Sequence, residues 1–197
     1  MKNKTVKRTN YAYLIMLTLC IVSTLYISCG KDKKDQPVLS EQDTVKTSRV
    51  EGANYNQTDD KITVEFEDKL AASIYTHYLG VKAALVNSDI NMAMSHAKKL
   101  STILTEDVNY KQLKATAQLM ALTKDIGKQR DFFSTLTDET IKILSKAKIA
   151  SGEIFKQFCP MAFDGDGGYW LSDSKEIRNP YYGNKMLTCG SVQEVLK

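Results

Sequence analysis

Residues 66–86 read FEDKLAASIYTHYLGVKAALV, and their apolar members recur at every third or fourth position. This spacing places them on one face of a helix. The apolar face is formed by Phe66, Leu70, Ile74, Tyr78, Val81 and Leu85. The helical period begins at Val64 and continues to about Lys148, without a proline in between. Because proline disrupts helix interiors, this stretch favours an uninterrupted helical body.

Three further helices are expected along this stretch. Asp89 suits the N-cap of the second helix, and Asn109 with Gln112 resembles a capping box that opens the third. A fourth helix carries the apolar face Phe132, Phe133, Leu136, Ile143, Leu144 and Ala147, with Thr140 among them. Short connections make neighbouring helices antiparallel. The sequence therefore predicts a mainly α fold, an up-down four-helix bundle over residues 61–150.

The pattern changes after Ser151-Gly152. Residues 153–158 favour a short strand, and residues 169–171 could pair with it across the glycine-rich turn at 164–168. Ser191, with Glu194 three residues later, suits the start of a last short helix. Residues 151–197 are therefore expected to form a small irregular cap with short strands. The cap would pack on the bundle, giving one globular domain over residues 61–197.

The first residues indicate export. Four basic residues precede an apolar run over residues 11–27, which is shorter than the roughly 20 residues of a spanning helix. The run ends at Ser28-Cys29, which resembles a bacterial lipoprotein signal, so we expect a signal peptide over residues 1–28 and lipidation of Cys29. An uncleaved membrane anchor is the alternative. Both interpretations place the domain in the cell envelope, tethered to a membrane and facing the periplasm or attached to the outer membrane.

A polar segment follows the signal, and the charges are balanced beyond it. Residues 29–60 are poor in apolar residues and are expected to form a disordered tether. The net charge of +4 resides in residues 1–28, and the rest of the chain has equal numbers of basic and acidic residues. This balance gives no indication of a nucleic-acid-binding surface.

Four sulfur residues stand out in the cap, in Cys159-Pro160-Met161 and Met186-Leu187-Thr188-Cys189. Thiolates and thioethers together are soft ligands that favour Cu(I) or Ag(I), whereas Met is not a usual ligand of Zn²⁺. The alternative is a Cys159–Cys189 disulfide, as is common in exported proteins. Closing this loop of roughly 30 residues would stabilise the fold by about 3–4 kcal/mol. Met161 and Met186 would then be gap-filling apolar residues.

Neither the histidines nor any motif indicates catalysis. His77 lies on the apolar face of the first helix and is expected to be structural, and His96 is expected on a solvated flank. A Met92/His96 pair at i and i+4 could chelate a soft metal, but we take neither histidine as a primary ligand. The chain has no phosphate-binding glycine loop, no G-x-S-x-G and no H-E-x-x-H. We therefore do not expect an enzyme.

The segments FCPMA (158–162), YWLS (169–172), EIRNPYYG (176–183) and MLTCG (186–190) resemble an exported bacterial domain of unknown function. That domain occurs as standalone lipoproteins and as an appendage of periplasmic adaptor subunits of copper/silver efflux pumps of the RND type. The helical segments YLGVKAAL (78–85) and QRDFF (129–133) are similar too, and the resemblance covers about residues 65–195.

The resemblance implies a helical body, a C-terminal tail with Cys and Met, and a link to heavy-metal efflux components. Cys159-Pro160-Met161 also resembles the start of a short heavy-metal-binding module, with Ala162 and Phe163 replacing its His-Pro. Residues and resemblance together predict an envelope lipoprotein that binds Cu(I) or Ag(I) through Cys159, Met161, Met186 and Cys189. The alternative is a module stapled by the Cys159–Cys189 disulfide that binds no metal and docks on an envelope partner.

Overall fold

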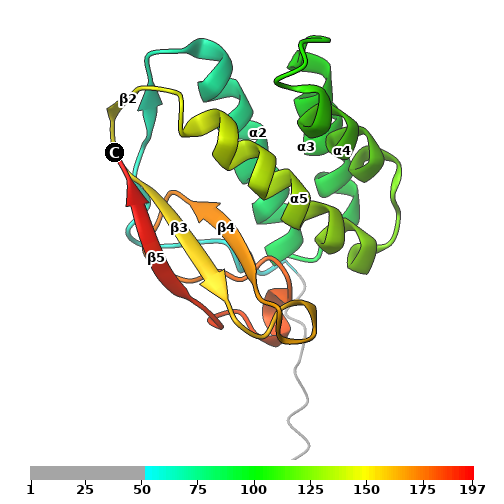
Figure 1. The fold of residues 1–197 in the computed structure, drawn as a ribbon. Helices are drawn as coiled ribbons and strands as arrows, with labels where there is room; N and C mark the ends of the chain where they lie inside the picture. The colour runs from blue at the N-terminus through cyan, green and yellow to red at the C-terminus, as the bar shows by residue number, and fades with distance from the viewer. Residues whose placement is uncertain (1–51) are drawn as a thin grey trace, which may run out of the picture. The chain divides into compact units, whose positions relative to one another are not determined.

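The computed structural model describes residues 52–197 (Figure 1). The expected signal peptide, Cys29 and the first part of the expected tether lie outside these residues. The four helices are α2 (Lys69–Val86), α3 (Ile90–Ile103), α4 (Lys111–Leu122) and α5 (Ile126–Leu144). Helix α2 packs against α3 and α5, and α4 packs against the same two helices. The predicted four-helix bundle is confirmed. Within residues 52–197, no helix is both long and apolar enough to cross a membrane.

The first helix starts later than the apolar pattern predicted. Strand β1 (Glu65–Phe66) pairs with β2 (Ile149–Ser151) next to the end of α5. Asp68 then caps α2, because its carboxylate accepts hydrogen bonds from the backbone N–H groups of Leu70 and Ala71 at 2.9 and 3.2 Å. The prediction of a helix from Val64 is wrong for this reason.

Of the two other predicted helix caps, the one at Asp89 is correct and the one at Asn109 is wrong. Asp89 is the N-cap of α3, and its carboxylate accepts from the backbone N–H of Met92 at 2.9 Å. The capping box of Asn109 and Gln112 is absent, since α4 begins at Lys111 with no side-chain cap. The backbone and side-chain amides of Asn109 instead both donate to the Asp107 carboxylate at 2.8 Å.

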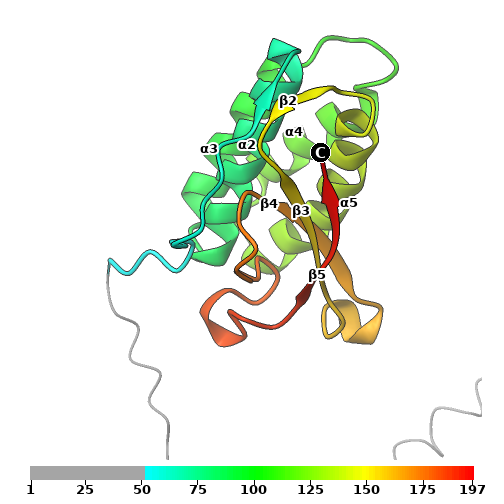
Figure 2. The ribbon, with the colours of Figure 1, turned by 90° about the vertical axis from the view of Figure 1, so that its left-hand side faces the viewer.

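The cap contains a three-stranded antiparallel sheet in the order β4-β3-β5, visible beside the helices in Figures 1 and 2. Its strands are β3 (Ile154–Cys159), β4 (Gly168–Ser172) and β5 (Ser191–Leu196). The first two confirm the expected strands. The expected helix at Ser191 is wrong: the segment pairs with β3, and Glu194 forms an ion pair with Lys156 of that strand at 3.3 Å.

The core lies between the sheet and helices α2 and α5. Tyr78 of α2 is fully buried, and its ring stacks on Phe133 of α5 with 5.2 Å between the ring centroids. Its hydroxyl oxygen lies 2.9 Å from the Thr137 hydroxyl of α5, and it accepts a hydrogen bond from the backbone N–H of Leu171 in β4 at 2.9 Å. One side chain therefore joins two helices and the sheet.

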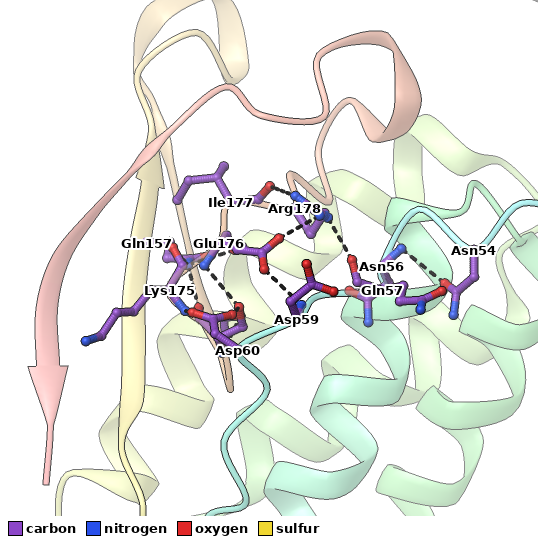
Figure 3. A network of polar contacts seen from close by, with 12 residues as sticks. Asn54, Asn56, Gln57, Asp59, Asp60, Gln157, Lys175, Glu176, Ile177 and Arg178 are labelled. Atoms are coloured by element: carbon purple, nitrogen blue, oxygen red, sulfur yellow. Dashed lines mark hydrogen bonds and ion pairs between the residues drawn. The ribbon is translucent and has the colours of Figure 1, made fainter.

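Residues 54–60 run along the domain. Asn54 and Tyr55 form hydrogen bonds with Asn87 at the end of α2, and residues 57–60 form hydrogen bonds with the loop that follows β4 (Figure 3). The Asp60 carboxylate accepts from the Ser174 hydroxyl and from the backbone N–H of Lys175. The hydrogen bond from Ser174 holds the pKa of Asp60 below its ordinary value. The expected tether, residues 29–60, thus includes a stretch with defined contacts to the cap.

Replacing Arg130 by methionine is expected to lower the free energy of unfolding by about 2 kcal/mol. The Arg130 guanidinium of α5 donates to the carbonyl of Pro180 at 3.0 Å, to the carbonyl of Leu85 at 3.3 Å and to the Ser88 hydroxyl at 3.1 Å. Methionine keeps the aliphatic packing and leaves these acceptors without their donor. Urea titration measures the loss. A change below about 0.5 kcal/mol, the size typical of a surface substitution, would contradict this role.

Candidate functional site

The two predicted cysteines meet at one end of the sheet. Cys159 is the last residue of β3, and Cys189 lies two residues before β5 begins. Their Sγ atoms are 2.7 Å apart. Cys159 is fully buried, whereas Cys189 is only partly buried. The pair therefore has one inner and one outer thiol.

Asn179 fixes the segment that carries Cys189. Its side-chain amide donates to the Cys189 carbonyl at 2.9 Å, and its backbone N–H donates to the Leu187 carbonyl at 2.8 Å. Its side-chain oxygen accepts from the backbone N–H of Tyr181 at 2.8 Å. Asn179 is fully buried, so these bonds are shielded from water. Asn179 thus sets the position of a thiol ten residues away.

Gly190 lets the chain pass close to β3 immediately after Cys189. Its φ of 143° lies in a region that side chains disfavour. A Cβ at this position would approach the Phe158 carbonyl oxygen and the Trp170 ring to 2.8 Å. Glycine at 190 therefore permits the close approach of the two cysteine-bearing segments.

Two tyrosine hydroxyls connect the loop before β5 to the β3–β4 hairpin. The hydroxyl of Tyr182 donates to the Met161 carbonyl, and that of Tyr181 donates to the Tyr169 carbonyl. Both hydrogen bonds link the segment of Cys189 to the neighbourhood of Cys159. Burial raises the pKa of Tyr181 well above its ordinary value, so this hydroxyl keeps its proton at neutral pH.

The two predicted methionines lie close to the cysteines in the sequence but do not fill the core. The Met161 side chain is 55% exposed, and the Met186 side chain is 37% exposed. Met186 shares a turn with Cys189, whose backbone N–H donates to the Met186 carbonyl at 3.1 Å. The expectation that these methionines would be gap-filling residues if the cysteines were oxidised does not fit their exposure.

The Cys189 thiol is not activated as a nucleophile. The hydrogen bond with the Cys159 thiol, followed by burial, raises the pKa of Cys189 above its ordinary value. A backbone N–H from Met161 acts in the opposite direction and is the weakest of the causes. Cys189 therefore remains a thiol at neutral pH unless a metal ion or an oxidant displaces its proton.

The donor set at this end of the sheet consists of sulfur. Residues 52–197 contain no group of three or more His, Cys, Asp or Glu side chains arranged to hold a metal ion. A tetrahedral site of the structural zinc type needs four such ligands. Two thiols, with the thioethers of Met161 and Met186 close to them in the sequence, match the ligand preference of Cu(I) and Ag(I). The same two thiols could instead be oxidised, since a disulfide places its sulfurs about 2.05 Å apart.

The two histidines come from neighbouring helices. The ring centroids of His77 in α2 and His96 in α3 are 6.2 Å apart. The His96 ring lies over Gly80, where an added Cβ would approach Nδ1 to 2.1 Å. Burial, with the nearby Lys99, lowers the pKa of both imidazoles. The sequence did not predict that the two rings, from α2 and α3, would lie this close to each other.

Sequence reasoning also missed a polar cluster around Lys82. A signal was present, because Lys82 follows Tyr78 by four positions and so extends the buried face of α2. A charged residue on an otherwise buried helix face is informative. Asp173, the other charged member, gave no such signal, because it lies in a loop after β4 whose path depends on tertiary contacts.

Residues 74–152 match a family model described as a protein of unknown function, DUF3347. The match begins within α2 and ends just beyond β2, so it covers most of α2 and all of α3, α4 and α5, and stops before the segments that carry Cys159 and Cys189. It supports the predicted relation to a domain of unknown function. Comparisons with curated proteins and with solved structures gave no match.

Proposed function

We propose that this protein binds a soft monovalent metal ion, Cu(I) or Ag(I), in the cell envelope. Cys159 and Cys189 would supply two thiolates, and Met161 and Met186 would supply thioethers from the exposed rim. The protein would be a lipid-anchored accessory of heavy-metal homeostasis or efflux, acting by ligand exchange with a partner rather than by catalysis. The observation that carries the proposal is the 2.7 Å approach of the two thiols, with an exposed methionine two residues after Cys159 and another three residues before Cys189.

The geometry suits metal transfer because the site has a closed and an open side. Cys159 is buried at the end of β3, so it would anchor the ion to the rigid sheet. Cys189 and the two thioethers lie nearer to solvent. A partner with soft ligands could therefore replace the outer ligands first. Deprotonation of both thiols on binding makes the affinity rise with pH.

The disulfide-stapled interaction module is the second candidate, and the same sulfur–sulfur approach favours it. Oxidation would join the end of β3 to the segment before β5. The protein would then bind no metal and would dock on an envelope partner. This alternative gives no role to the exposure of Met161 and Met186, which is why we rank it second.

Cu(I) titration of the reduced full chain against a competing chelator tests the proposal. We expect one tightly bound Cu(I), with the affinity lowered at least about 100-fold in the Cys159→Ser/Cys189→Ser double variant. The Met161→Leu/Met186→Leu variant is expected to weaken binding about tenfold. Met92→Leu is the matched control, because Met92 is exposed on α3 and should leave the affinity unchanged.

Equal Cu(I) affinity in the wild type and the double serine variant would refute the metal-binding proposal. A thiol count on protein taken from the native envelope then separates the candidates further. Metal binding predicts that Cys159 and Cys189 are found either as two free thiols or as two thiolates protected by bound metal. A thiol count in which neither cysteine reacts until a reductant is added would favour the stapled module.

A further inference from the structure

Lys82 is buried to a degree that is rare for a lysine. Its side chain projects from α2 and is only 2% exposed. Charged side chains are seldom buried this far without a close partner. The ammonium of Lys82 has a single long hydrogen bond, to the Ser172 hydroxyl at 3.5 Å. Asp173 lies near enough to stabilise the charge, but its carboxylate also forms an ion pair with Lys61 at 3.5 Å.

A donor without any partner accompanies Lys82. Tyr75 lies about two turns earlier on α2, is 4% exposed, and its hydroxyl has no hydrogen-bond partner in the structure. Burial raises the pKa of Tyr75 well above its ordinary value, and Asp173 adds to this effect. The hydroxyl therefore keeps its proton. An unpaired buried donor is unfavourable, so the Tyr75 hydroxyl, together with the weakly bonded Lys82 ammonium, indicates a missing acceptor.

Both side chains line a cavity of about 430 Å³. The cavity lies between residues 61–64, helix α2 and Asp173. Its polar wall is formed by Lys82, Tyr75 and Lys61 together with Asp173, while Ile62, Val64 and Leu79 contribute apolar surface. This volume is in the range of small-molecule sites, which combine apolar walls with a few polar groups.

We propose that this cavity binds a small organic anion, a carboxylate attached to an apolar body. The carboxylate would accept hydrogen bonds from the Lys82 ammonium and the Tyr75 hydroxyl. The apolar body would lie against Ile62, Val64 and Leu79. The ligand would supply the acceptor that the Tyr75 hydroxyl lacks and a closer acceptor than Ser172 for the Lys82 ammonium. This site is independent of the sulfur pair and of the proposed metal binding.

The charges around the cavity favour an anion over a cation. Lys61 and Lys82 contribute two positive charges and Asp173 contributes one negative charge, and Arg178 also acts on Lys82. The apolar wall favours an organic ligand over inorganic phosphate, which would leave that wall without contacts. The side-chain oxygen of Asn56 also lines the cavity and is an acceptor without a partner. The choice of a carboxylate rather than an amine therefore rests on the positive charges of Lys61 and Lys82.

Calorimetric titration of the full chain with hexanoate at pH 7 tests the proposal, with hexylammonium as the ligand of opposite charge. We expect hexanoate to bind and hexylammonium to bind at least about tenfold more weakly. Lys82→Met should weaken hexanoate binding about tenfold and Tyr75→Phe severalfold. Lys128→Met, which removes one exposed charge from α5, is the control and should bind as the wild type does.

A measurement on the wild type avoids dependence on the folding of the variants. Burial lowers the pKa of Lys82 to about 8, so raising the pH from 7 to 9.5 removes the positive charge. The affinity for hexanoate should then fall about tenfold. The other groups facing the ammonium are Asp173, Lys61, Arg178 and Tyr75. Absence of hexanoate binding, equal binding of hexylammonium, or unchanged binding by a folded Lys82→Met variant would each overturn the proposal.

Discussion

Truncation of Tyr78 to alanine is expected to lower the free energy of unfolding by about 3–5 kcal/mol. The side chain is fully buried and stacks on Phe133. Its removal would leave a cavity where α2, α5 and β4 meet, and these elements keep their positions through other contacts, so the cavity would not collapse completely. Thermal and urea unfolding of the variant measure the effect, with the far-UV circular dichroism spectrum as a check on the native fold.

The Tyr78→Phe variant separates the hydroxyl from the ring. It should lower the free energy of unfolding by about 1–3 kcal/mol, because the buried N–H of Leu171 loses its acceptor. The Thr137 hydroxyl loses a partner at 2.9 Å as well. If Tyr78→Phe were as stable as the wild type, the link between α2 and β4 would not depend on these hydrogen bonds. If Tyr78→Ala lowered the free energy of unfolding no more than Tyr78→Phe does, the ring would not contribute to the stability of the core.

Lys82→Met is expected to raise the free energy of unfolding at pH 7 by about 3 kcal/mol. Burial lowers the pKa of Lys82 from 10.5 to about 8, so the folded state at pH 7 holds a charged group in an unfavourable environment. Methionine has a similar length and no charge. Its burial adds an apolar contact without the desolvation penalty. The substitution should therefore stabilise the domain while removing the proposed ligand contact.

The free energy of unfolding of the wild type should rise with pH relative to that of Lys82→Met. Below pH 8 both the folded and the unfolded states hold the proton of Lys82, and the penalty of burying the charge is complete. Between pH 8 and 10.5 the unfolded state binds more protons than the folded state, so stability rises with pH. The wild type should gain about 2 kcal/mol relative to Lys82→Met between pH 7 and 9.5.

Urea unfolding of both proteins at several pH values between 7 and 9.5 measures this relative gain. Comparing the two proteins cancels the contribution of other titrating groups. This range also stays below the pKa of the buried hydroxyls of Tyr75, Tyr78 and Tyr181, which burial raises. Lys128→Met should follow the wild type at every pH. Parallel curves for the wild type and Lys82→Met would show that the buried amine does not titrate in this range.

The sequence predicted the parts of the fold that depend on local pattern. The helices were found because their apolar faces repeat every three or four residues, and β3 and β4 because aromatic and branched residues flank a glycine-rich turn. Strand β5 was missed, since Ser191 and Glu194 have the spacing of a helix cap and only pairing with β3 decides otherwise. Strand β1 was missed because two residues carry no periodicity.

In the candidate site, too, the residue types were predictable from the sequence, whereas their arrangement depends on tertiary contacts. The ligand types at positions 159, 161, 186 and 189 were readable from the sequence. The 2.7 Å approach of the thiols was not, because it depends on Asn179 and Gly190, which act through tertiary contacts. Burial of Lys82 could be inferred from its helical position. The cavity that it lines could not, because residues 61–64 and Asp173 come from distant parts of the chain.

The hydrogen bonds of residues 54–60 determine how the domain would respond to a pulling force on its N-terminal side. A load applied at Asn54 would act first on Asn87, the C-cap of α2, which forms hydrogen bonds with Asn54 and Tyr55. It would then pass through Gln57, Asp59 and Asp60 to residues 174–178 before it reached β1 (Figure 3). Because the loop after β4 continues into Asn179, which holds the Cys189 segment, the end of α2 and the cap would bear mechanical tension before β1 does.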